Sequence, residues 1–180
     1  MKKKSDFDYL HSLVREQIKE LRQLGPIAYD ILRALLPPTG AIDVKNLVNK
    51  VIQDRRPVVQ VDPDGLQLRA APEITAPVLK SMRQQSQLIL LDPGSEEAVG
   101  TRGRWLHVLE MDGNNGYVEA NYVSRVKSYQ DPSAIIDMTM NALEYFNRLD
   151  FVDITQENDN FRVTLTPKGK NMADLLFQPD

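Results

Sequence analysis

The 180-residue sequence contains no cysteine and only two histidines, His11 and His107. Without cysteine the chain can form neither a disulfide nor a thiolate metal site, and it has no thiol nucleophile. No catalytic or metal-binding motif surrounds either histidine, so histidine-based acid–base catalysis and soft-metal sites are disfavoured. We therefore expect a protein that is not an enzyme and that binds neither a metal nor a cofactor.

Long hydrophobic runs are also missing from the sequence. No stretch approaches the roughly 18–20 consecutive apolar residues of a membrane-spanning helix. The basic start, residues 1–4, is followed by acidic residues rather than by the apolar core of a signal peptide. Apolar residues make up 42% of the chain and charged residues 26%, which is typical of a globular protein. We therefore expect a cytoplasmic protein of one large or two small domains.

The net charge of −3 is unevenly distributed along the chain. Residues 1–57 carry 11 Lys and Arg against 7 Asp and Glu, residues 58–127 carry 7 against 9, and residues 128–180 carry 4 against 9. The first third is therefore basic and the last third acidic. Because a nucleic-acid-binding protein needs positive charge on the element that enters the groove, the position of that element decides whether this distribution favours DNA.

Helical spacing of apolar residues occurs at both ends of the chain. The helices that this spacing predicts cover residues 6–24, 26–36, 43–53, 132–148 and 167–176. Asp43 and Asp131 precede two of these helices and are expected to cap them. Between the last two helices, residues 151–166 read as two strands around a polar turn, QENDN (156–160).

Residues 58–127 have a different pattern, in which short alternating or β-branched runs are separated by turn signals such as PDG (63–65) and DPG (92–94). Several short strands in this span predict a small barrel or sandwich. Asn115-Gly116 is expected to supply a hairpin turn with positive φ.

Five short motifs follow one another in this middle segment. They are GLQLRAAP (65–72), SQLILLD (86–92), WLHV (105–108), GYV (116–118) and NYV (121–123). Their order and spacing resemble a bacterial SH3 (SH3b) domain over roughly residues 58–126. The resemblance implies a small β-barrel, and SH3b domains often bind cell-wall peptides.

The flanking segments carry another pattern. Leu143, Leu149, Phe151 and Val152 lead from a helix through a tight turn into a strand, and a second strand ends in LTPKGK (165–170). This pattern resembles the end of MarR-like winged-helix regulators, in which the recognition helix precedes a two-stranded wing. By this resemblance residues 132–148 form the recognition helix, and residues 26–36 and 43–53 form the first two core helices.

Together the two resemblances imply an α+β fold, a winged helix (three helices plus a two-stranded wing) with an inserted small SH3-like β-barrel. The winged helix is then discontinuous, from residues 1–56 and 128–180, and the barrel covers residues 58–127. Such insertions are tolerated because the termini of a small domain usually lie close together. Apolar residues of the helix over 6–24 fall near heptad positions, so this helix forms a homodimer contact or packs on its own domain.

The expected barrel contains the candidate residues for binding a partner protein. Aromatic and Arg side chains supply most of the energy of protein interfaces. The candidate partner-binding residues are Arg69, Arg102, Arg104, Trp105, Tyr117 and Tyr122. Two alternatives stay open, because Trp105 and Tyr117 could belong to the barrel core and the arginines could be solvated surface.

The winged-helix resemblance implies DNA binding, but the charge of the relevant elements disfavours it. The expected recognition helix carries Asp137 and Glu144 against a single Arg148, and the wing tip QENDN (156–160) holds two acids and no base. Phosphate would be repelled by such a surface. If this face nevertheless contacts DNA, the candidate residues are Ser133, Thr139, Asn141, Arg148 and Arg162.

We therefore predict a non-enzymatic adaptor or regulatory protein that acts through protein–protein contacts, with an unidentified protein partner. The alternative is a winged-helix transcription regulator in which the barrel senses a ligand or a partner. A third hypothesis is a cell-wall-associated SH3b protein.

Overall fold

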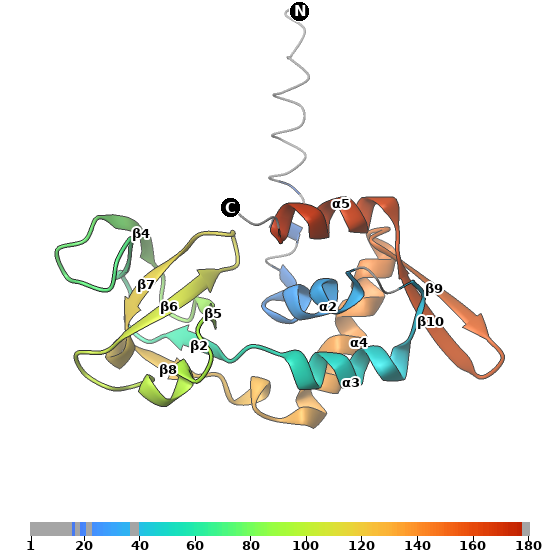
Figure 1. Ribbon diagram of the computed structural model, residues 1–180, viewed down its shortest axis with the longest axis horizontal. Helices are drawn as coiled ribbons and strands as arrows, with labels where there is room; N and C mark the ends of the chain where they lie inside the picture. The colour runs from blue at the N-terminus through green and yellow to red at the C-terminus, as the bar shows by residue number, and fades with distance from the viewer. Residues whose placement is uncertain (1–15, 17–18, 21–22, 37–39, 178–180) are drawn as a thin grey trace, which may run out of the picture.

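The computed structural model describes residues 16, 19–20, 23–36 and 40–177. Within these residues the chain is a mixed α+β protein with four helices and two antiparallel sheets (Figure 1). The α+β expectation is confirmed. Most of the expected helix over residues 6–24, with the dimer contact assigned to it, lies outside the described residues.

Capping side chains fix where three of the four described helices begin. The helices are α2 (Ile27–Leu35), α3 (Val44–Asp54), α4 (Pro132–Arg148) and α5 (Pro167–Leu176). The Asp43 carboxylate accepts hydrogen bonds from the backbone N–H of Lys45 at 2.9 Å and of Asn46 at 3.4 Å. The Asp131 carboxylate accepts one from the backbone N–H of Ser133 at 2.9 Å. Both predicted N-caps are therefore confirmed.

The smaller sheet contains the hairpin that precedes α5. Its strands are β1 (Ile42–Asp43), β9 (Val152–Glu157) and β10 (Asn160–Leu165), in the order β1-β10-β9. In Figure 1 the β9–β10 hairpin projects from the helices at the end of the molecule opposite the larger sheet. The strands are longer than expected, because only Asn158 and Asp159 of the predicted QENDN turn remain outside them.

The larger sheet contains the short strands of the middle segment. Its strands are β2 (Val58–Val61), β3 (Leu66–Arg69), β4 (Val78–Met82), β5 (Gln87–Leu90), β6 (Trp105–Glu110), β7 (Asn115–Glu119) and β8 (Val123–Arg125), in the order β4-β3-β7-β6-β5-β2-β8. Three 3₁₀ helices accompany them: η1 (Ser95–Ala98), η2 (Ala120–Tyr122) and η3 (Lys127–Tyr129). Burial alternates along β6, where Leu106 and Val108 are buried and Trp105 and His107 are half-buried, as expected for a sheet with one face toward a core.

The hairpin between β6 and β7 corrects the expected role of Asn115-Gly116. The positive φ in this turn, 91°, belongs to Gly113, whereas Gly116 lies inside β7 and pairs with Val108. A Cβ at Gly116 would lie 2.6 Å from the carbonyl oxygen of Arg69. Gly116 is therefore needed for the close approach of β7 to β3, and not for the turn.

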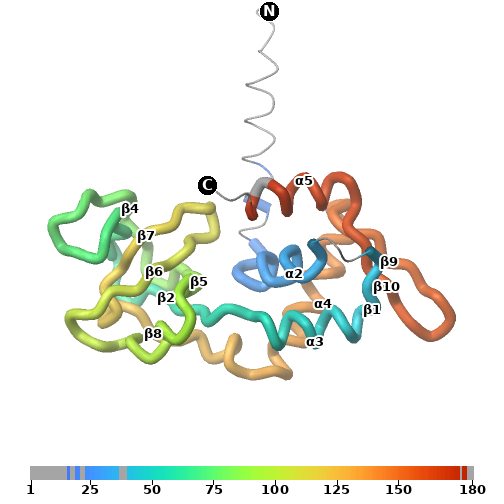
Figure 2. Tube along the Cα trace, viewed as in Figure 1, coloured from blue at the N-terminus to red at the C-terminus, as the bar shows by residue number. Residues whose placement is uncertain are grey.

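Two main hydrophobic clusters form the interior. The first combines residues from both ends of the chain, including Ile31 and Leu47 with Phe146 and Phe151. Figure 2 shows this arrangement, in which α2 and α3 lie beside α4 and α5. The second cluster is built only from residues of the middle segment, among them Leu68, Leu88, Leu106 and Val118.

The helical part and the larger sheet meet in a small set of well-buried residues. The Tyr29 hydroxyl donates a hydrogen bond to the Met111 carbonyl oxygen at 2.9 Å, and both residues join Ile89 in a third apolar cluster. The chain enters and leaves the larger sheet at adjacent points, because the Val126 N–H donates to the Val58 carbonyl oxygen at 3.1 Å. None of the helices in the described part of the chain combines the length and the apolar character that crossing a membrane would require.

Candidate functional site

The outer face of the larger sheet brings several predicted residues together. Trp105 pairs with Glu119 across β6 and β7, and Tyr117 pairs with both His107 and Arg69. The alternation of side chains along each strand places all five on the side away from the hydrophobic cluster of the middle segment. Trp105 and Tyr117 are half-buried members of this face, and the core cluster contains neither of them.

A groove of about 320 Å³ lies on this face. Its lining includes Asp64, Arg69, Ile74, Trp105, Glu119 and Tyr122. The apolar part is accessible, since Ile74 is 68% exposed and Tyr122 is 43% exposed. The groove therefore combines two aromatic side chains and an exposed isoleucine with two carboxylates. We call it the barrel groove, after the barrel that the sequence predicts for this segment.

Arg69 forms a fixed wall of the barrel groove. Its guanidinium donates hydrogen bonds to the Ala76 carbonyl oxygen at 2.8 Å and to the side-chain oxygen of Gln67. The bond to Ala76 ties β3 to the loop that carries Ile74. Both bonds go to neutral oxygens, so Arg69 keeps its positive charge, and the two carboxylates of Asp64 and Glu119 leave the groove lining with one net negative charge.

The remaining predicted partner-binding residues lie next to the groove. Arg102 and Arg104 are exposed in the loop that precedes β6, and the Arg104 carbonyl oxygen accepts a hydrogen bond from the Ala120 N–H at 2.9 Å. This bond holds the loop beside η2, which ends in Tyr122. Tyr117 stacks on His107 with ring centroids 4.7 Å apart. Of the six predicted residues, Arg69, Trp105 and Tyr122 line the groove.

Sequence reasoning missed Ile74, Asp64 and Glu119. Ile74 lies in a loop that closes on itself through a hydrogen bond from the Ala70 N–H to the Pro77 carbonyl oxygen at 3.0 Å. The sequence signal that could have identified Ile74 was an isoleucine in a short loop that contains prolines. That Ile74 lines the same groove as Trp105 depends on the folding of the loop, which residue spacing does not reveal.

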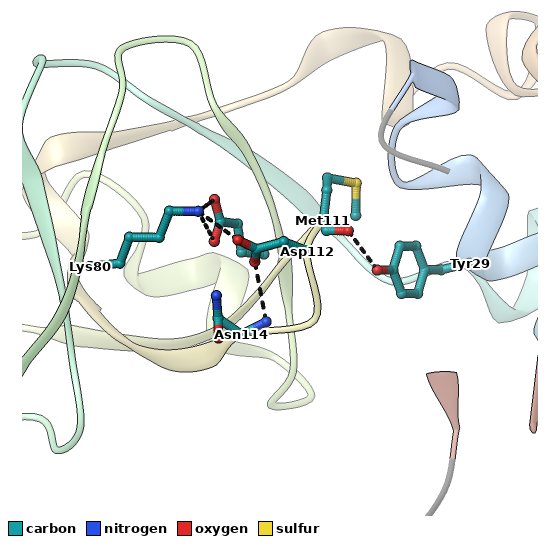
Figure 3. A network of polar contacts seen from close by, with 6 residues as sticks. Tyr29, Lys80, Met111, Asp112 and Asn114 are labelled. Carbon is teal, nitrogen blue, oxygen red and sulfur yellow. Dashed lines mark hydrogen bonds and ion pairs between the residues drawn. The ribbon is translucent and has the colours of Figure 1, made fainter. Parts of the chain in front are cut away.

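A lysine between two carboxylates holds the β6–β7 hairpin beside β4 (Figure 3). The Lys80 ammonium donates to Glu110 at 2.6 and 2.8 Å and to Asp112 at 2.6 Å. Burial raises the pKa of Asp112, but its hydrogen bonds to Glu110 and Lys80 outweigh burial and lower it to about 2. Burial, together with the neighbouring Asp112, raises the pKa of Glu110. In Figure 3 the same hairpin meets Tyr29 through Met111, so the cluster positions the contact between the two parts of the molecule.

The candidate DNA-contacting residues lie in different environments in the structure. Thr139 is fully buried in the core face of α4, so its assignment as a base-reading residue is wrong. Ser133, Asn141 and Arg148 are exposed on α4. The Arg162 guanidinium on β10 donates to the Glu157 carboxylate at 3.1 Å, which offsets its charge. Within the described residues, no group of His, Asp and Glu side chains is arranged to hold a metal ion.

No protein-family model matches the sequence, and no curated protein matches it either.

Proposed function

We propose that the protein is a non-enzymatic adaptor that binds an extended segment of a partner protein in the barrel groove. The observation that supports this proposal is that Trp105, Tyr122 and Ile74 line one groove together with the carboxylates of Asp64 and Glu119, and that Ile74 and Tyr122 are exposed. In this proposal residues 58–127 form an SH3b-like barrel, and the flanks form a winged helix that carries it.

The chemistry of the groove favours one kind of ligand. Flat aromatic rings bind extended, proline-containing segments well, because such segments lose little conformational entropy on binding. The carboxylates of Asp64 and Glu119 favour a Lys or Arg in the same segment. We therefore expect a ligand of proline or small apolar residues with at least one basic residue.

Trp105 provides a direct test, because it is the sole tryptophan of the chain. Tryptophan-free decapeptides selected by display on the intact protein should shift the Trp105 emission on titration. Tyr122→Ala should weaken their binding at least about tenfold, as expected for an aromatic anchor. Phe161→Ala is the matched control, since Phe161 is an exposed aromatic residue, 50% exposed, on the β9–β10 hairpin.

Three outcomes would contradict the proposal. One is that no selected peptide changes the Trp105 emission, and another is that Tyr122→Ala and Phe161→Ala have the same effect. The third is that a soluble cell-wall muropeptide shifts the Trp105 emission in a Tyr122-dependent way while none of the peptides does. That result would favour the cell-wall hypothesis. The arginines beside the groove can be tested in the same titration, where Arg102→Glu with Arg104→Glu should raise the affinity for a basic segment that they border, because two repelling charges become attracting ones.

A further inference from the structure

An apolar groove lies at the other end of the molecule, between α3, α4 and the β9–β10 hairpin. Its volume is about 460 Å³, and its apolar lining is formed by Val44, Val48, Ile136, Met140 and Phe161. Ile136 is 42%, Met140 46% and Phe161 50% exposed. We call this surface the helix–hairpin groove.

The fold does not require these apolar residues at the surface. The core face of α4 is formed by Ile135, Thr139, Leu143 and Phe146, and Ile136 and Met140 lie one turn apart beside that face. Phe161 shares a sheet face with buried Val163 but lies beyond the edge of the core. Of the seven large hydrophobic residues exposed in the described chain, three meet in this one groove. Exposed apolar residues gathered in this way mark interaction sites.

Acidic side chains border the helix–hairpin groove. Asp43 and Asp159 belong to its lining, where Lys45 is the basic residue. On α4, Asp137 and Glu144 are exposed and lie three and four residues from Met140, which makes them its neighbours on the helix surface. Carboxylates therefore outnumber basic groups around the apolar floor.

We propose that the helix–hairpin groove binds an amphipathic helix of a partner protein, with an apolar face bordered by Lys or Arg. The groove offers mostly apolar side chains, so it suits a ligand whose backbone hydrogen bonds are satisfied internally, as they are in a helix. The acidic border selects basic residues at the edges of that helix. DNA fits this surface poorly, because its phosphates would meet carboxylates and apolar side chains.

This site is separate from the barrel groove, so its test is independent of the proposed function. A display library of 16-residue peptides is selected on the intact protein and counter-selected on the double variant Met140→Asp with Phe161→Asp. The enriched peptides should carry apolar residues at i, i+3, i+4 and i+7 with Lys or Arg beside them. Their affinity should fall at least about tenfold in the double variant.

Matched variants separate apolar from electrostatic contributions. Ile74→Asp with Tyr122→Asp alters equally exposed residues of the barrel groove and should leave these affinities unchanged. Asp137→Lys with Glu144→Lys should weaken binding severalfold and reduce its dependence on salt. Circular dichroism of each variant is measured as well, to check that the variant is folded. The Trp105 emission should stay constant, because Trp105 belongs to the other groove.

Several results would overturn the proposal. The first is that no peptide distinguishes the intact protein from the Met140→Asp, Phe161→Asp variant. The second is enrichment of peptides without Lys or Arg, or affinities that are unaffected by reversing Asp137 and Glu144. The third is tight binding of a DNA duplex that the same double variant abolishes, which would assign this face to nucleic acid.

Discussion

Asp30 is a buried carboxylate in α2 at the contact with the larger sheet. Only 6% of it is exposed, and Tyr29, Arg56 and Ile89 lie around the same small cavity. The Arg33 guanidinium contacts its carboxylate at 3.4 Å. Burial raises the pKa of Asp30 from 3.8 to about 7, although Arg33 and Arg56 favour the charged form. The charge of Asp30 is therefore a cost to folding at neutral pH.

This pKa predicts a pH dependence of stability. The pKa is higher in the folded than in the unfolded chain, so the protonated carboxyl stabilises the fold below pH 3.8, and this contribution is lost as the pH rises through about 7. Asp30→Asn should remove the dependence. Relative to the wild type, the variant should gain roughly 3 kcal/mol in free energy of unfolding between pH 4.5 and pH 8.

Urea denaturation of both proteins across this pH range measures the gain. The exposed Asp174→Asn on α5 serves as the control and should stay close to the wild type at each pH. A constant difference between Asp30→Asn and the wild type at all pH values would show that Asp30 does not titrate in this range.

At the scale of elements, Lys80 joins β4 to the β6–β7 hairpin. Lys80→Met removes the ammonium group that both the Glu110 and the Asp112 carboxylates bind. Lys80 is 37% exposed, so we expect a loss of about 1–2 kcal/mol at pH 7, below the roughly 3–5 kcal/mol for breaking a fully buried pair. The loss should shrink at pH 4, because protonation of Glu110, whose pKa is raised, relieves the repulsion.

Chemical denaturation at pH 7 and pH 4 separates these contributions. Lys127→Met, at an exposed position in η3, is the control for removing a lysine and should change stability by less than about 0.5 kcal/mol. If Lys80→Met costs the same at both pH values, repulsion between the two carboxylates is not the reason for the loss.

Local signals were enough to predict the helices. The expected bounds of α4 and α5, residues 132–148 and 167–176, agree with the structure because caps and proline act within a few residues. Spacing could also have identified Thr139 as buried, since it lies four residues from both Ile135 and Leu143. We instead treated it as a polar surface residue because of its type.

Features that depend on distant residues were not predictable in this way. The requirement for Gly116 comes from the Arg69 backbone, which is far away in sequence. The helix–hairpin groove needs α3, α4 and β10 together, and α4 has more apolar positions than its core face accepts. Pairing between distant segments therefore limited the prediction of both grooves.

At the scale of the whole molecule, few of the described residues join the helical part to the larger sheet. The main polar contact is the hydrogen bond from Tyr29 to Met111, and the apolar contact is the cluster of Tyr29, Ile89 and Met111. A second bond, from the Ile27 N–H to the Tyr129 hydroxyl at 2.9 Å, lies where the chain returns to the helices. Tyr129 and Val58 belong to the cluster of the helical part. With the two proposed grooves at opposite ends, this arrangement would let one chain hold two partners.

The adjacency of Val58 and Val126 predicts that the helical part folds without the larger sheet. Replacing residues 59–125 by a Gly/Ser linker of about four residues should suffice, because hairpin-like connections of two to five residues span such short gaps. Keeping Val58, Val126 and Tyr129 preserves the first hydrophobic cluster. We expect a helical protein that unfolds cooperatively, with lower stability than the intact chain because Tyr29 loses Met111 and Ile89. Circular dichroism and urea denaturation measure this, with residues 57–126 alone as the companion sample. If the shortened chain is unfolded while residues 57–126 fold, the larger sheet is required for the helices to fold, and the helical part is not an independent domain.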